Sequence, residues 1–211
     1  MPERADARLR LGVAGLALLS LACGGLSAES PAPAPVEVDP MNTTASFTST
    51  DTGLTSLLSS SPRLAAPASF PPDNAARADA LTRKVPTAQA RTHICPARFF
   101  TCKIDEERAE FFVVGHVDIS PQAVGVVFLG LGDLDAPVVL ITYAPSGEIV
   151  GGQIVGGAFG DMEYGYEGTL TAPDRLEVNR YVWFNGEEKE FVEDYTFQIR
   201  ANGAVDRVIA L

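Results

Sequence analysis

Residues 111–119 read FFVVGHVDI, and this stretch decides the fold class of the second half of the chain. Successive side chains of a β-strand point to opposite faces of its sheet. β-branched and aromatic residues, which favour strands, occupy most of these positions. The stretch therefore predicts a strand with Phe111, Val113, Val117 and Ile119 on a buried face and with His116 and Asp118 on the solvent face.

Seven further stretches of strand length follow, separated by turn residues such as Pro145-Ser146-Gly147, Asn185-Gly186 and Asn202-Gly203. They are 124–131, 138–143, 149–155, 164–170, 176–184, 191–200 and 205–209. No helical pattern stands out after residue 92. Because hairpins between consecutive strands are the simplest connections, we expect an all-β fold, an antiparallel up-and-down meander that curls into a half-barrel or barrel.

The first half of the chain has a different composition. Of the 68 residues from 24 to 91, 39 are Ala, Pro, Ser or Thr, and Ser30–Pro35 reads as a polyproline spacer. So few large apolar residues do not offset the entropy of ordering the chain. Residues 23–91 are therefore predicted to form a disordered tether ahead of a β domain at 92–211. Asp73–Lys84 is a candidate short helix, interpreted as transient structure in a linker rather than as a docking segment.

The chain is acidic, and its net negative charge lies in the second half. The 211 residues carry a net charge of −11. Residues 1–91 are neutral, with eight basic and eight acidic residues, whereas 92–211 hold eight basic and nineteen acidic ones. Because phosphate binding needs a basic face, a nucleic-acid partner is excluded.

The N-terminus has the pattern of an export signal. Arg4, Arg8 and Arg10 precede a short apolar run, Leu11–Ala22, which is shorter than the roughly 20 residues that span a bilayer. The run ends in Ser20-Leu21-Ala22-Cys23, and this end resembles a bacterial lipoprotein signal, with the usual leucine and small residue in swapped order.

The resemblance implies a signal peptide at 1–22 and a lipid on Cys23, which becomes the mature N-terminus. It further implies a membrane anchor in the bacterial envelope, and Gly24 after the cysteine favours the outer membrane. The alternative is an ordinary signal peptide, cut after Ala28, and a freely secreted domain. The two similar turns at 146–150 and 202–206 also resemble hairpins in the C-terminal domains of uncharacterised bacterial lipoproteins, a resemblance that carries no activity.

Two further cysteines remain, Cys95 and Cys102. An even pair in an exported chain is expected to form a disulfide, here as a clasp at the entry to the first strand. The alternative is a zinc site in which His93 and His116 join the cysteines. The spacing does not match the paired ligands of structural zinc sites, so no metal is predicted.

Candidate catalytic groups are sparse. His116 and Asp118 share a strand face, but no nucleophile beside them is identifiable, so His116 is interpreted as a solvent-face histidine. The acidic clusters around Asp133 and Asp161 match no calcium-loop pattern and are interpreted as solvated loops. The cluster that begins at Glu187 is interpreted as keeping a strand edge soluble and unpaired. No catalytic residue, metal or cofactor is predicted.

The aromatic residues of the later strands are the weak candidates for a binding site. Tyr164 and Tyr166 share one face of a strand, and Tyr181 and Trp183 share a face of the next. If these four converge outside the core, they form a ligand-binding patch.

We therefore interpret the chain as a lipid-anchored envelope protein with a non-enzymatic β domain for binding an envelope protein or for structural support. The alternatives are a freely secreted carrier of a small ligand or an inhibitor, and last a small hydrolase that uses carboxylates.

Overall fold

The structure is a computed structural model that describes residues 46–70, 77–100, 102, 109–132, 135–160, 163–184 and 188–209. The chain divides into two compact units, Met1–Asn42 and Thr43–Leu211, and all described residues belong to the second. The predicted signal peptide, Cys23 and the tether up to residue 45 lie outside the described residues. So do the predicted turn at Asn185-Gly186 and three members of the acidic clusters, Asp133, Asp161 and Glu187.

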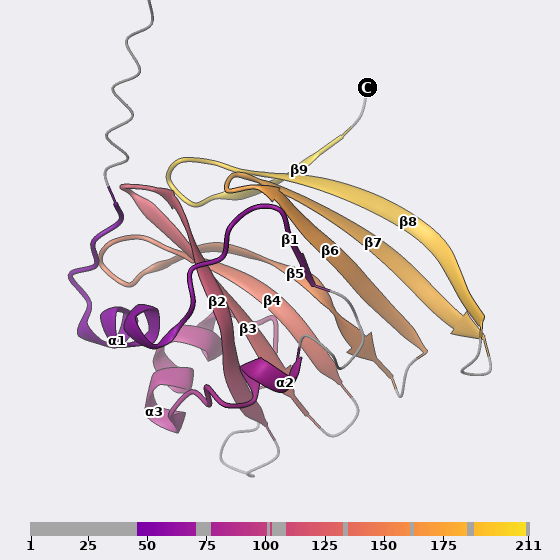
Figure 1. The fold of residues 1–211 in the computed structure, drawn as a ribbon, viewed down its shortest axis with the longest axis horizontal. Coiled ribbons are helices and arrows are strands. Elements are labelled where there is room, and N and C mark those ends of the chain that lie inside the picture. The colour runs from indigo at the N-terminus through magenta and orange to yellow at the C-terminus, as the bar shows by residue number, and fades with distance from the viewer. Residues whose placement is uncertain are drawn as a thin grey trace, which may run out of the picture. The chain divides into compact units, whose positions relative to one another are not determined.

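Eight antiparallel strands lie side by side in their order along the chain, from β2 to β9 (Figure 1). This confirms the predicted all-β meander. β2 and β9 form the two ends of this path, so the sheet is open, like a half-barrel, rather than closed. The strands are β2 (Glu110–Ser120), β3 (Ala123–Leu131), β4 (Ala136–Tyr143), β5 (Ile149–Phe159), β6 (Tyr164–Ala172), β7 (Arg175–Phe184), β8 (Glu188–Ile199) and β9 (Val205–Val208).

Apolar side chains fill both faces of β2–β4. An inner cluster joins these strands to β6–β8 and includes Val117, Val127, Leu129, Leu140, Leu170, Leu176, Val178, Phe197 and Ile199. A helix-side cluster lies on the opposite face and includes Phe111, Val113, Val126, Phe128, Ile141 and Tyr143. The runs of β3 and β4 are therefore apolar throughout because both of their faces are buried.

The predicted faces of β2 are partly wrong. Phe111 and Val113 belong to the helix-side cluster, whereas Val117 belongs to the inner cluster and Ile119 packs against it. The reason is a β-bulge between Val113 and Gly115, where the register shifts by one residue. An extra residue in one strand reverses the alternation beyond it, and simple alternation along the sequence does not reveal this.

The sheet divides between β5 and β6. These strands pair only over Gly156–Phe159 and Tyr164–Glu167. Farther along β6, the short strand β1 (Ala68–Phe70) pairs antiparallel with Gly168–Leu170. The close approach depends on glycines, because a Cβ at Gly168 would lie 2.2 Å from the carbonyl oxygen of Val155. β1 thus completes the sheet where β5 has left it.

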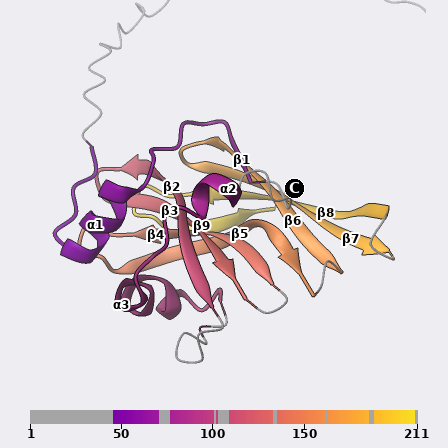
Figure 2. The ribbon, with the colours of Figure 1, turned by 60° about the horizontal axis from the view of Figure 1, so that its bottom comes forward.

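The prediction that the tether extends to residue 91 is wrong for the described residues from 46 onward, because this segment packs against the sheet. It forms α1 (Thr52–Ser60), β1, α2 (Arg77–Ala80), α3 (Thr87–Gln89), the π-helix η1 (Ala90–Ile94) and the 3-10 helix η2 (Cys95–Ala97). Figures 1 and 2 show α1, α2 and α3 beside β2–β4, while β7 and β8 extend away from them. Leu54, Leu57, Phe70 and Val85 are buried. We call residues 46–100 the strap.

The strap also covers the outer edge of β2. Leu64 N donates to His116 O at 2.7 Å, and Val85 N donates to Phe111 O at 2.7 Å. Such pairing removes the unpaired backbone groups that make an edge strand prone to aggregation. Ala80 at the end of α2 is fully buried, so the described part of the predicted Asp73–Lys84 helix, residues 77–84, packs on the domain, and its interpretation as transient structure in a linker is wrong there.

Candidate functional site

The four predicted aromatic residues do not converge. In the β6–β7 register, Tyr164 lies opposite Val182 and Tyr166 opposite Arg180, whereas Tyr181 lies opposite Gly165. Directly opposed residues of an antiparallel pair point to the same face. Tyr164 and Tyr166 therefore share the face of β6–β8 that turns toward the inner cluster, and Tyr181 and Trp183 share the other, which we call the outer face.

The inner pair is part of the packing at the β5–β6 junction. Phe159 stacks on Tyr164 with ring centroids 5.2 Å apart and also meets the edge of Tyr166 at 5.7 Å. The guanidinium of Arg180 lies 5.9 Å from the centre of the Tyr164 ring. Tyr166 is half-buried against the inner cluster. These contacts hold the junction together, and we assign the pair a structural role.

The outer pair belongs to a different group of rings. Phe191 lies opposite Tyr181 in the β7–β8 register, and their ring centroids are 5.9 Å apart. Trp183 lies against Gly165, where a Cβ would come within 2.4 Å of the indole. Phe191 is 52% exposed, although it is a large apolar side chain. We call Tyr181, Trp183 and Phe191 the outer aromatic patch.

The sequence alone does not identify Phe191 as a member of this patch. Simple alternation back from Tyr195 and Phe197 places Phe191 on the inner face of β8. The register shifts between Arg180 and Tyr181, so that Val192 is left over on β8 and Phe191 turns to the outer face. A second bulge thus assembles the patch, just as the first redirects β2.

A polar cluster lies at the covered edge of β2. Ser61 Oγ is 2.6 Å from His116 Nδ1, and Arg63 Nη2 is 2.7 Å from Asp118 Oδ2. Ser61 is 9% exposed and follows α1 directly. His116 is therefore half-buried beneath the strap, and its interpretation as a solvent-face histidine is wrong. Ser61 and Arg63 were missed because they lie in the predicted tether.

This cluster contains the residue types of a serine hydrolase site but not its arrangement. A catalytic triad needs a carboxylate on the second ring nitrogen of the histidine, which orients the ring. The structure instead places Asp118 in an ion pair with Arg63. The Ser61–His116 hydrogen bond and the Arg63–Asp118 ion pair each join the strap to β2. We therefore assign this cluster the structural role of holding the strap in place.

The cluster makes stability depend on pH. Burial lowers the pKa of His116 below its usual 6.5, and Arg63 lowers it too, against the raising effects of Asp118 and Ser61. The native state therefore favours the neutral ring. Because the unfolded chain takes up a proton first, the contribution of His116 to stability is full above about pH 6.5 and is lost as the pH falls toward the lowered pKa. We expect the urea midpoint to fall over this range and His116→Gln to flatten that decline.

Asp118→Asn provides the matched test of this pH dependence. Removing the carboxylate that raises the His116 pKa lowers the native pKa further, so the decline should extend to lower pH and become larger. Identical pH slopes for the wild-type chain and His116→Gln would contradict the assignment.

His93 is buried in a second latch, which joins the strap to the sheet. Its Nε2 lies 3.5 Å from Asp51 Oδ1, the carboxylate that caps α1, and the buried Tyr143 hydroxyl donates to His93 O at 2.6 Å. Burial raises the pKa of Tyr143 well above its usual 10.0, so the hydroxyl stays protonated as a donor. This latch joins α1 and η1 to β4.

The predicted disulfide is present. Cys95 is bonded to Cys102, with Cα atoms 5.7 Å apart, which removes both thiols from the alternative zinc site. The closed loop carries Phe99 and Phe100 onto glycines of the sheet. Cβ atoms at Gly152 and Gly130 would lie 2.5 and 2.6 Å from these two rings. The clasp thus fixes two aromatic rings over the helix-side face.

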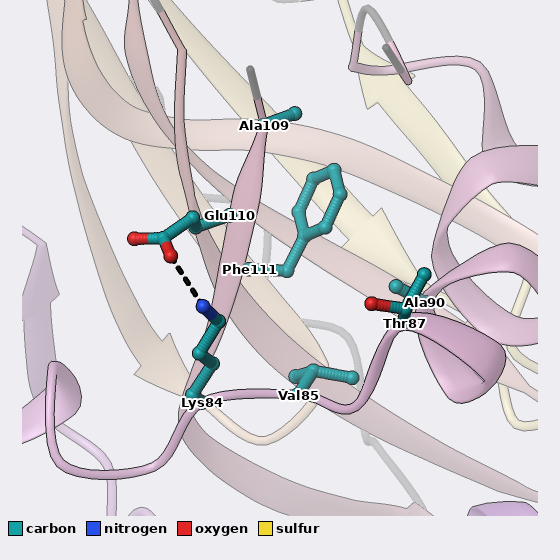
Figure 3. Close-up of a pocket in the computed structure, with 7 residues that line it drawn as sticks. All are labelled: Lys84, Val85, Thr87, Ala90, Ala109, Glu110 and Phe111. Carbon is teal, nitrogen blue, oxygen red and sulfur yellow. Dashed lines mark hydrogen bonds and ion pairs between the residues drawn. The ribbon is translucent and has the colours of Figure 1, made fainter. Parts of the chain in front are cut away.

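A pocket of about 390 Å³ lies where the strap meets the start of β2. It is lined by Lys84, Val85, Thr87, Ala90, Ala109, Glu110 and Phe111. Figure 3 shows Val85, Ala90 and Phe111 on one side of β2 and the Lys84–Glu110 ion pair on the other. Its size falls in the range of small-ligand pockets, and its lining combines apolar side chains with the charged Lys84 and Glu110.

Over the described residues, no three metal-binding side chains gather at one point. None of the helices in that part of the chain is long and apolar enough to cross a membrane.

The described features together define an open antiparallel sheet with a partly exposed aromatic patch on strands that the helices leave uncovered. Searches against family models, curated proteins and solved structures find no match to this chain.

Proposed function

We propose that the chain is a lipid-anchored protein of the bacterial outer membrane whose β domain is a non-enzymatic module that binds another envelope component. The anchor is supported by the sequence from Leu11 to Cys23, which resembles a lipoprotein signal. Lipid anchors of this kind hold well when more than one acyl chain enters the bilayer.

The outer aromatic patch carries the binding part of the proposal. Exposed large apolar residues that form a contiguous group mark interaction sites more often than isolated ones do. Tyrosine and tryptophan are also enriched at the centres of protein interfaces. Phe191 is half exposed beside Tyr181, on strands that extend away from the helices (Figure 1).

The anchor has a direct test. Protein extracted with mild detergent from its own host should have the mass of a chain that begins at Cys23 and carries acyl groups. Cys23→Ser should move the protein from the membrane fraction to the soluble fraction. A mature chain that begins beyond Cys23 without lipid would overturn the anchor and favour the secreted alternative.

The binding function is tested by cross-linking in the host. A photoreactive amino acid at position 191 of the anchored full chain should give a discrete cross-linked product. The same residue at position 148 is the matched control, because Glu148 is an exposed side chain in the turn before β5. Failure of position 191 to cross-link above the control would contradict the proposed function.

A second candidate is a carrier of a small ligand, and the pocket beside Phe111 is the observation that favours it. Phe111 lines the pocket and lies on β2, whereas the outer aromatic patch lies on β7 and β8. A substitution of Phe111 therefore tests the pocket separately from the patch. Native mass spectrometry of the detergent extract would detect a retained small molecule directly.

A further inference from the structure

The outer aromatic patch lies beside a row of acidic side chains. In the register, Gly165, Tyr181 and Phe191 form one row across β6–β8. The next row on the same face, about 7 Å along the strands, is Glu167, Asn179 and Asp194. Glu177 follows in the third row, opposite Thr196. On this face, acidic side chains therefore lie next to the aromatic rings.

The positive charge described on this face is small. Two basic residues of β6–β8 lie at register positions on this face: Arg175 on β7, whose Nε lies 3.5 Å from Glu177 Oε1, and Lys189 on β8, opposite Trp183. They compare with three acidic ones, Glu167, Glu177 and Asp194. Arg180 turns to the inner face, above Tyr164. The described part of the outer face therefore combines apolar rings with net negative charge.

We propose that the outer aromatic patch and its acidic row bind a segment of a partner protein that alternates basic and apolar side chains. This inference rests on the proposed binding function and adds the chemistry of the partner. Apolar side chains of such a segment would cover Phe191, while its lysines or arginines would meet Asp194 and Glu177. Cations also bind favourably over the faces of tryptophan and tyrosine rings.

The charge argues against the other candidate occupants. A second copy of this chain would bring acidic rows together, and the chain as a whole carries a net charge of −11. An anionic lipid surface or a nucleic acid would be repelled for the same reason. A basic partner gains both long-range attraction and short-range pairing.

Trp183 gives a direct readout, because it is the only tryptophan in the chain. The full chain is titrated with a synthetic peptide that alternates lysine and leucine, and separately with the peptide that has glutamate in place of lysine. The lysine peptide should shift the Trp183 emission to shorter wavelength in a saturable way, and the glutamate peptide should not. Raising the salt from about 0.1 M to about 1 M should weaken binding severalfold.

Variants separate the contribution of the aromatic rings to binding from that of the carboxylates. Phe191→Ser should weaken binding of the lysine peptide about tenfold, as at interface hot spots. Glu177→Gln with Asp194→Asn should weaken it about threefold to tenfold and reduce the salt dependence. Glu148→Gln is the matched control, since it removes an exposed carboxylate away from the face, and it should leave the affinity unchanged.

The outcomes also distinguish this inference from the proposed function. Equal binding of both peptides, salt-independent binding, or no binding of the lysine peptide would overturn the basic partner, even if position 191 still cross-links in the envelope. Failure of that cross-link would overturn the proposed function itself. Preferential binding of the lysine peptide that Phe191→Ser and the charge variant both weaken supports the inference.

Discussion

A chain that begins at residue 92 is expected not to fold, although it contains all eight strands of the meander. It lacks Leu54, Leu57, Phe70 and Val85, which are at most 5% exposed in the folded domain. Burial of one large apolar side chain contributes about 1.5–3 kcal/mol. The loss of all of them is comparable to the entire stability of a typical domain, about 5–15 kcal/mol. The truncation also uncovers the helix-side face and the outer edge of β2.

Thermal unfolding followed by circular dichroism, together with gel filtration, measures this effect. A chain that begins at residue 46 should be monomeric and should unfold cooperatively, whereas the chain from 92 should aggregate or show no transition. Single substitutions check the cause. Leu57→Ala should cost about 2–5 kcal/mol, and Leu58→Ala, which is only partly buried on the same helix, should cost less. A cooperative transition in the chain from 92 would show that the strap is dispensable.

Gly157→Ala is expected to lower the free energy of unfolding by about 3 kcal/mol or more. Gly157 has a φ of +100°, a conformation that side chains with a Cβ rarely adopt. A Cβ there would also lie 2.2 Å from the carbonyl oxygen of Ala136, which is backbone and has little room to move. Both effects act where β5 pairs with β4 on one side and with β6 on the other, so the junction between β5 and β6 depends on this residue.

The control for this substitution is Gly132→Ala. The nearest atom to a Cβ at Gly132 is Asp135 O at 3.6 Å, an ordinary contact, so the change should stay within about 1 kcal/mol. Chemical denaturation of both variants measures the difference. Equal stabilities would mean that the backbone at Gly157 adapts without cost and that the junction does not depend on glycine.

The strands were predictable because their signals are local. Each of the eight predicted runs overlaps one of the strands β2–β9. The turn residues Gly147 and Gly203 adopt positive φ, as their places in tight turns require. The disulfide was predictable in the same way, because it joins two cysteines close together in the chain.

The strap was not predictable because its signals are weak and its partners distant. Composition describes only the average residue of a segment, and few of the described residues between 46 and 91 are large, buried side chains. Leu54 and Leu57 lie one turn apart on α1, among serines and threonines. Their stabilisation comes from the sheet they cover, which a local reading of the segment does not include.

The candidate site, like the fold, was only partly predictable from the sequence. The sequence identified Tyr181 and Trp183 but grouped them with Tyr164 and Tyr166, because a strand pattern does not say which faces of neighbouring strands coincide. Phe191 joined the patch only through the register shift opposite Tyr181. Ser61 met His116 only because the strap runs along β2.

By itself, the sequence determined the fold class, the positions of the strands and the pairing of Cys95 with Cys102, since these depend on alternation, turn residues and short separations along the chain. Only the tertiary structure decided which face each side chain takes, where the domain begins and which residues meet at a surface. A single extra residue in β2 or β8 reverses a face, and a few buried leucines attach a segment of low-hydrophobicity composition to the core. Both effects arise from packing between residues far apart in the chain, which no local pattern records.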